Sequence, residues 1–187
     1  VLLWLLGAPI TRLLFQRGAF TAADTAQVVA ALNIYVVGML FAALDYPLNF
    51  AFYARNNTLL PALVGVVSVG VYVAVALLLV GPLGFLGLVW ADTAKQAAHL
   101  VLMVFLLWRR VGRLHAGTLR GVAEVTLAAA LLALVTWGAR ELLAPLAAPN
   151  IGGDILLAGA AGGAGLAAFA LFLWWRGQAE IRTIYIK

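Results

Sequence analysis

The sequence predicts an all-α bundle of transmembrane helices, because of its composition and the way apolar and polar segments alternate. Hydrophobic residues make up 65% of the 187 residues, and charged residues make up only 10%. Soluble domains are about half apolar and about a quarter charged. The mean hydropathy is +1.06, and apolar runs of helical length are separated by short polar turns. We therefore expect an integral membrane protein that crosses the bilayer several times.

Charge and residue usage exclude several other classes of function. The net charge of +5 sits in loops and at helix ends, where it reports membrane topology, so we expect no nucleic-acid partner. The chain has no cysteine, which excludes disulfides, iron–sulfur clusters and thiolate zinc sites. His99 and His115 lack metal-ligand spacing, so no metal is expected. No segment offers a nucleophile–base pair or a phosphate-binding loop, so an enzyme is not expected.

Short polar turns divide the chain into about five full spans plus one partial span. Thr21 followed by Asp24 resembles a capping box, so a helix should begin there. Pro9 is tolerable where neighbouring helices take up the freed backbone groups. Because Val1 lies inside an apolar run, we expect missing N-terminal helices of the same chain before it. The expected helices cover residues 22–54, 59–80, 84–108, 119–143 and 155–175, after a truncated one over residues 1–16.

The chain is organised around the helix expected from Gly84 to Trp108. Its length suits a hydrocarbon core of roughly 30 Å at about 1.5 Å per residue. Asp92, Lys95, Gln96 and His99 fall within one stripe about 100° wide, and Lys95 lies near the bilayer midplane. An ionised side chain at that depth costs several kcal/mol or more. The stripe should therefore face a helix bundle or a wet cavity.

The distribution of basic residues predicts the orientation in the membrane. Arg55 lies in one turn, and arginines cluster in the loop at residues 109–120 and in the tail. These three segments lie on the same side if the helices alternate, and the positive-inside rule makes that side cytoplasmic. The C-terminus should then be cytoplasmic, and the turn at residues 17–24 should lie on the outer face.

Two sequence blocks resemble the lipid II flippases of the MurJ (MviN) family, within the MOP exporter superfamily. The first block is LLFQRGAFT at residues 13–21, and the second is FYARNNT at residues 52–58, with Pro61 behind it. The later turn at residues 81–84 and the Gly-Leu pair at residues 87–88 match the next pair of helices.

The chain also departs from the family's pattern at three places. Asn56 and Asn57 stand where many members have an acidic residue before the threonine, and Asp92 and Lys95 add charge to a helix that is often only small and polar. The resemblance covers residues 1–113. The rest of the chain shares only two further apolar helices.

The resemblance implies a fourteen-helix transporter with two pseudo-symmetric six-helix lobes. Residues 1–113 would hold the last four helices of the second lobe, the first of them truncated. Residues 114–187 would hold two appended helices and a short cytoplasmic tail. Such a transporter moves lipid II, the undecaprenyl-diphosphate-linked peptidoglycan precursor, across the bacterial cytoplasmic membrane by alternating access. Its partners would be this lipid-linked precursor, membrane lipids and the earlier helices of the chain.

Asp92, Lys95 and His99 allow two interpretations. They form a cavity site for the diphosphate headgroup or for a coupling ion, or Asp92 and Lys95, spaced i,i+3, partly neutralise each other and lock two helices together. No cofactor is expected, although coupling to a monovalent cation or to the membrane potential stays open.

Other candidate positions lie near a proline, at an interface and in a glycine-rich helix. Pro47 should kink its helix and serve as a hinge. Beside it, Asp45 is a partner for Lys95 or a hinge-associated ion ligand, or else it caps kinked backbone. Asn49 lies close to the same kink and is a further candidate for the substrate or ion pathway. The remaining candidates are Arg55, for the membrane interface or lipid phosphate, and Gly159 with Gly163, for helix packing or a groove for the lipid tail.

Two classes of function remain. One is transport: lipid II flipping, or export of another polyprenyl-linked oligosaccharide, or ion-coupled drug antiport by a relative from the same superfamily. The other is a membrane scaffold that moves nothing. Transporters need polar groups near the midplane and helices that break, and a scaffold would have little reason to bear their cost. This comparison favours transport.

Overall fold

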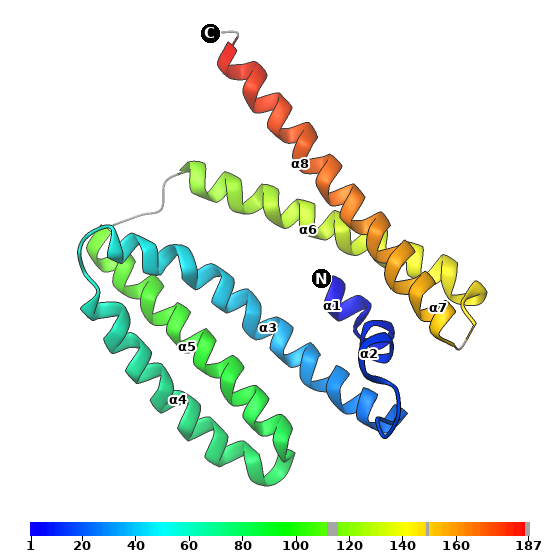
Figure 1. Cartoon of the computed structure of the whole chain (residues 1–187). Helices are drawn as coiled ribbons and strands as arrows, with labels where there is room; N and C mark the ends of the chain where they lie inside the picture. Colours follow the sequence, from blue (N-terminus) through cyan, green and yellow to red (C-terminus); the bar gives the residue numbers. More distant parts are fainter. Residues whose placement is uncertain (112–115, 149, 186–187) are drawn as a thin grey trace. The chain divides into compact units, whose positions relative to one another are not determined.

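The structure is a computed structural model, which describes residues 1–111, 116–148 and 150–185, and their side chains except at positions 110–122 and 178–185. The described residues are almost entirely helical and contain no strand (Figure 1), which confirms the predicted all-α class. The elements are α1 (Leu2–Leu5), α2 (Gly7–Phe15), α3 (Ala22–Tyr53), α4 (Leu59–Leu83), α5 (Phe85–Val111), α6 (Ala116–Leu143), the 3-10 helix η1 (Ala144–Leu146), α7 (Ile151–Ile155), the π-helix η2 (Leu156–Ala161) and α8 (Gly162–Tyr185).

In the described part of the chain, 4 helical segments are long and apolar enough to cross a membrane. They are Ala22–Tyr53, Leu59–Leu83, Ala123–Leu146 and Ile151–Gly177. The expected central span is also a helix, α5, with 27 residues. It is less apolar than the others because Asp92, Lys95 and His99 lie within it. Its length still suffices to cross the hydrocarbon core.

The predicted partial span at the start of the chain is broken into α1 and α2. The break follows Leu5, and the physical reason is Pro9, which cannot donate a backbone hydrogen bond and whose ring clashes with the carbonyl four residues back. The freed Leu5 carbonyl accepts a hydrogen bond from Arg140 Nη1 at 3.3 Å. The expectation that a neighbouring helix takes up this group is confirmed.

The predicted capping box at the start of α3 is also confirmed. The Thr21 backbone N–H donates to Asp24 Oδ2 at 2.7 Å, and the Asp24 N–H donates to Thr21 Oγ1 at 3.3 Å. This reciprocal pair satisfies two backbone donors that the helix itself leaves free. The helix then runs without a break through Pro47 as far as Tyr53.

The chain divides into two compact units. We call residues 30–114 the α3–α5 unit, because they hold most of α3 with α4 and α5, and we call residues 1–29 together with 115–187 the α6–α8 unit. The first 29 residues thus pack with the C-terminal helices. The domain boundary expected at residue 113 separates the second transporter lobe from the two appended helices. It was not based on packing, so the compact units do not test it and it stays a prediction.

Small residues allow close helix packing in the α3–α5 unit. A Cβ at Gly38 would lie 3.4 Å from Thr93 Cα, and Thr93 Oγ1 donates to the Ile34 carbonyl at 3.2 Å. A Cβ at Gly87 would collide with the Leu79 backbone, so α4 and α5 form a tight antiparallel hairpin (Figure 1). The buried core of the unit comprises Phe52, Val64 and Met103.

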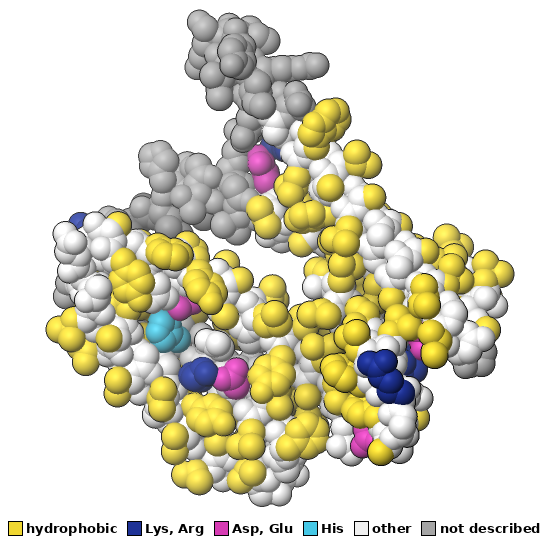
Figure 2. Space-filling model, viewed as in Figure 1, with side chains coloured by type: hydrophobic (Ala, Val, Ile, Leu, Met, Phe, Trp, Pro, Cys, Tyr) yellow, Lys and Arg dark blue, Asp and Glu magenta, His cyan; other side chains and the backbone are white. Residues whose placement is uncertain are grey.

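Large apolar side chains cover much of the face that Figure 2 shows. Leu77, Leu78 and Val66 of α4 are among the most exposed, at 75%, 73% and 71%. A soluble monomer rarely exposes such continuous apolar surface. The pattern fits helices that face lipid or other helices of a membrane protein.

Candidate functional site

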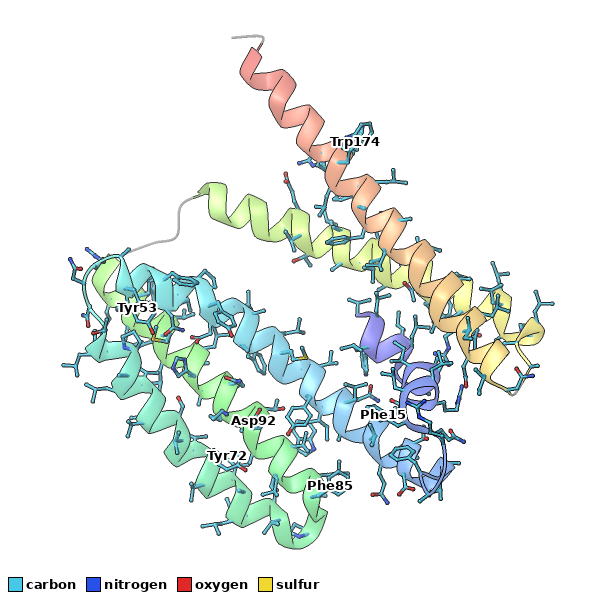
Figure 3. The ribbon with its side chains drawn as sticks, viewed as in Figure 1. Phe15, Tyr53, Tyr72, Phe85, Asp92 and Trp174 are labelled. Atoms are coloured by element: carbon cyan, nitrogen blue, oxygen red, sulfur yellow. The ribbon has the colours of Figure 1, made fainter. Side chains whose placement is uncertain are left out.

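The polar stripe of α5 contains the ion pair that the i,i+3 spacing of Asp92 and Lys95 predicts, and the function of the stripe stays a prediction. Lys95 Nζ makes an ion pair with Asp92 Oδ1, and it lies 5.8 Å from the ring centre of Tyr72 on α4. Asp92 and Tyr72 are both labelled in Figure 3. The side chains of Lys95 and Asp92 are 30% and 28% exposed. The two charges thus neutralise each other within α5, as the i,i+3 spacing predicts.

His99, one turn further along α5, contacts α3. His99 Nδ1 lies 2.9 Å from Asp45 Oδ1, and the two side chains are only 17% and 15% exposed. The partner of Asp45 is therefore His99 and not Lys95. Asn49 completes the group, because its Nδ2 donates to Asp45 Oδ2 at 2.5 Å and to the Asp45 carbonyl at 3.0 Å.

These side chains border a cavity of about 340 Å³ between α3 and α5. Asp45, Asn49 and His99, which the sequence singles out from separate segments, all line it. The complete lining is Ala42, Asp45, Tyr46, Asn49, Phe50, Tyr53, Gln96 and His99. We call this the α3–α5 cavity. Carboxylate, amide and imidazole groups in a mostly apolar pocket provide the few placed polar contacts typical of a small-ligand site.

Sequence reasoning missed the aromatic side of this cavity. Tyr46, Phe50 and Tyr53 line it from α3, and Figure 3 labels Tyr53 near the end of that helix. Their spacing of four and then three residues places them on one helical face. This spacing was a usable signal, since the same face carries Asp45 and Asn49.

The remaining predicted residues are not among those that line the cavity. Arg55 is exposed in the turn that follows α3, as an interface residue should be. Gly159 and Gly163 face open space, whereas a Cβ at Gly165 would overlap Thr136 Oγ1 on α6, and one at Gly162 would lie 3.2 Å from Leu6 Cδ1. Packing within the α6–α8 unit therefore uses Gly162 and Gly165, and the roles proposed for Gly159 and Gly163 stay predictions.

A second polar cluster, in the α6–α8 unit, was not anticipated. Arg12 Nε donates to both carboxylate oxygens of Asp154, at 2.9 and 3.0 Å, and Asp154 is only 12% exposed. Gln16 and Asn150 join them in lining a cavity of about 370 Å³. A lone arginine inside an apolar segment was the available signal. Its partner lies 142 residues away, which no local spacing reveals.

A further ion pair joins α8 to α6 in the same unit. Arg176 Nη2 contacts Glu124 Oε1, and the two side chains are 30% and 19% exposed. The sequence predicts that Arg176 lies at the membrane interface, because it directly follows two tryptophans. The pair connects helices that follow each other in the chain, as expected for an antiparallel helix pair.

Comparison with known proteins identifies a family. The family model described as lipid II flippase MurJ matches residues 1–152, so the likeness extends beyond the limit of residue 113 seen in the sequence blocks. A probable lipid II flippase MurJ of Bdellovibrio bacteriovorus is 33% identical over 105 residues, which are 56% of this chain and 20% of that protein.

Two rhizobial relatives carry the same description, probable lipid II flippase MurJ. That of Rhizobium tropici is 34% identical over 110 residues, covering 59% of this chain and 21% of the relative. That of Rhizobium meliloti is 32% identical over 143 residues, covering 76% and 27%. The chain thus spans between 20% and 27% of the length of these relatives.

Proposed function

The chain belongs to the MurJ lipid II flippase family, and from this premise we propose that it forms part of a transporter that moves lipid II across the bacterial cytoplasmic membrane. The precursor would pass from the cytoplasmic to the outer leaflet by alternating access and supply cell-wall synthesis. The observation that supports transport is the α3–α5 cavity, in which Asp45, Asn49, Gln96 and His99 converge inside helices of a membrane protein.

The energetic argument for transport rests on the cost of these polar groups. A charged side chain near the middle of a bilayer costs several kcal/mol unless it faces a cavity or a partner. An apolar pair of helices would pack as well without this cost. The polar groups also lie next to Pro47, whose missing N–H weakens α3 at that point. A cavity beside a helix that can bend is what alternating access requires.

The C-terminal helices suit contact with the lipid part of the substrate. Gly159 and Gly163 have open space beside them, so a polyprenyl chain could lie along that face without steric hindrance. Arg55, exposed at the end of α3, would anchor the cytoplasmic interface or contact lipid phosphate. In this arrangement the C-terminus is cytoplasmic.

Complementation tests the function. The complete gene product is expressed in a bacterium depleted of its own lipid II flippase, and membrane levels are followed by immunoblot. We expect growth with the wild type and with Tyr35→Phe, a control on an exposed part of α3. We expect no growth with Asp45→Asn at equal protein levels.

Direct measurement of lipid II translocation in proteoliposomes separates this proposal from its alternatives. A well-expressed wild type that neither rescues growth nor moves lipid II, but moves another polyprenyl-linked glycan, would be an exporter of a different kind. A protein that moves none of these would be a scaffold.

A further inference from the structure

The contact between Asp45 and His99 brings together two buried polar atoms. Asp45 Oδ1 and His99 Nδ1 are buried, and neither has a hydrogen-bonding partner in the described part of the chain. They lie 2.9 Å apart. A carboxylate oxygen only accepts, so these two atoms can share a hydrogen bond only with a proton on Nδ1. The second ring nitrogen, Nε2, then has the lone pair that can bind a further proton.

The geometry disfavours a metal cation at Asp45. Asn49 Nδ2 contacts two acceptors, Asp45 Oδ2 and the Asp45 carbonyl, which fixes the amide with its nitrogen toward the carboxylate. Both carboxylate oxygens therefore face donors. Hard cations need several oxygen ligands, and the described residues contain no group of three or more His, Cys, Asp or Glu that could hold a metal.

Of the described groups around Asp45, His99 is the side chain that can neutralise its carboxylate. From α4 the one titratable group near the stripe is Tyr72, which lies beside Lys95. On α5 itself, Lys95 is already paired with Asp92. From α3, Tyr46 and Tyr53 line the cavity. Among these described groups, a protonated His99 is what can neutralise the Asp45 carboxylate.

We propose that the Asp45–His99 pair is a proton-binding site and that H⁺ is the ion coupled to transport; the coupling, though not the binding, rests on the proposed function. One proton adds to His99 Nε2 and forms an N–H bond, while Nδ1–H stays beside Asp45 Oδ1. No other bond changes, and the net charge of the pair goes from −1 to zero.

Protonation strengthens the attraction between α5 and α3 at a point two residues from Pro47. Because two opposite charges attract far more strongly in a low-dielectric interior than in water, the protonated pair holds the two helices together. Loss of the proton weakens this contact. The bend that Pro47 permits in α3 is then coupled to the protonation of His99.

The binding step is tested without lipid II. The complete gene product, with ¹⁵N-labelled histidine, is reconstituted in nanodiscs and followed by solid-state NMR between about pH 5 and pH 8, the range in which histidine usually changes its charge. The His99 signals are those absent from His99→Gln. We expect them to change from neutral imidazole to imidazolium. A His99 that keeps one protonation state over this range overturns the proposal.

The coupling step is tested in proteoliposomes that contain lipid II and an entrapped pH-sensitive dye. We expect proton movement to accompany lipid II translocation and to fall at least tenfold in Asp45→Asn and in His99→Gln, which corresponds to a rise of about 1.4 kcal/mol in the activation free energy of transport. Tyr35→Phe should keep both signals. Replacing Na⁺ by choline should change neither.

The outcomes separate this inference from the proposed function. Lipid II translocation without proton movement, or with a requirement for Na⁺, overturns the proton site and leaves the flippase intact. Proton movement without any lipid II translocation supports the site and overturns the proposed substrate.

Discussion

At the scale of the residue, several charged side chains in the described helices lie in pairs. Each pair joins a basic and an acidic side chain that are both at least half buried. The described pairs are Arg12–Asp154, Lys95–Asp92, His99–Asp45 and Arg176–Glu124. Removal of one partner leaves a charge without compensation, whereas removal of both leaves none. A single variant, which leaves one unpaired charge, should therefore be more harmful than the double variant, which leaves none.

The Arg12–Asp154 pair should stabilise the α6–α8 unit. Arg12→Met leaves Asp154 without its cation in a largely buried position, and we expect the free energy of unfolding to fall by about 1–3 kcal/mol. The double variant Arg12→Met/Asp154→Leu should recover at least half of this loss. Thermal unfolding of the complete gene product in detergent measures both, with the exposed Arg17→Gln as control. Strictly additive losses would show that the pair has no such coupling.

The Lys95–Asp92 pair should act by mutual neutralisation, since neither residue lines the α3–α5 cavity. Lys95→Gln leaves an unpaired carboxylate in the membrane, and Asp92→Asn leaves an unpaired ammonium group. We expect each single variant to fail in complementation. The double variant Asp92→Asn/Lys95→Gln should grow, because it carries neither charge. Failure of the double variant at normal membrane levels would instead assign the pair a direct role in transport.

At the scale of the element, glycine positions and a π-helical segment decide which faces of the helices meet. The spacing of Gly159 and Gly163 predicts a packing face, but Gly162 and Gly165 make the close approaches. The π-helical segment Leu156–Ala161 explains the difference. It adds a residue to the turn and rotates the rest of the helix relative to the pattern of a regular α-helix. Sequence spacing could not reveal this, because it assumes an uninterrupted period of 3.6 residues.

Substitution of neighbouring glycines tests this packing. A Cβ at Gly165 would overlap Thr136 Oγ1, whereas one at Gly163 would meet open space. We expect Gly165→Ala to lower the free energy of unfolding by about 1–3 kcal/mol through overpacking. Gly163→Ala should be nearly neutral. Adding Thr136→Ala should restore part of the loss, because it removes the overlapping oxygen. Equal unfolding temperatures for the two alanine variants would refute the close contact.

The proline in α3 provides a second prediction at this scale. Pro47→Ala restores a backbone donor inside the helix, so we expect a higher unfolding temperature. A stiffer α3 should bend less readily, and lipid II translocation in proteoliposomes should slow by about tenfold. Pro61→Ala is a suitable control, because Pro61 lies in the first turn of α4, where proline is tolerated. Unchanged translocation with a higher unfolding temperature would remove the hinge from the mechanism.

At the scale of the whole molecule, the features that the sequence predicted are local, whereas the contacts that join distant segments were missed. Composition and turn residues place the long helices, and the capping pair at Thr21 and Asp24 marks the start of α3. The polar stripe of α5 follows from helical period alone. In contrast, the Arg12–Asp154 pair and the packing of the first 29 residues on the C-terminal helices depend on segments more than 100 residues apart. Only three-dimensional packing determines such contacts.

The orientation in the membrane is the last prediction, and residue usage makes it testable. The chain has no cysteine. A single introduced cysteine can therefore be labelled specifically, once any cysteines elsewhere in the complete gene product have been replaced. We expect Ala19→Cys and Leu146→Cys to react in intact cells with a thiol reagent that cannot cross the membrane, because the positive-inside rule predicts that both turns lie on the outer side. Ala54→Cys, beside Arg55, should react only after permeabilisation. The reverse pattern would place Arg55 and the 109–120 loop outside and would require the proposed direction of transport to be reassigned.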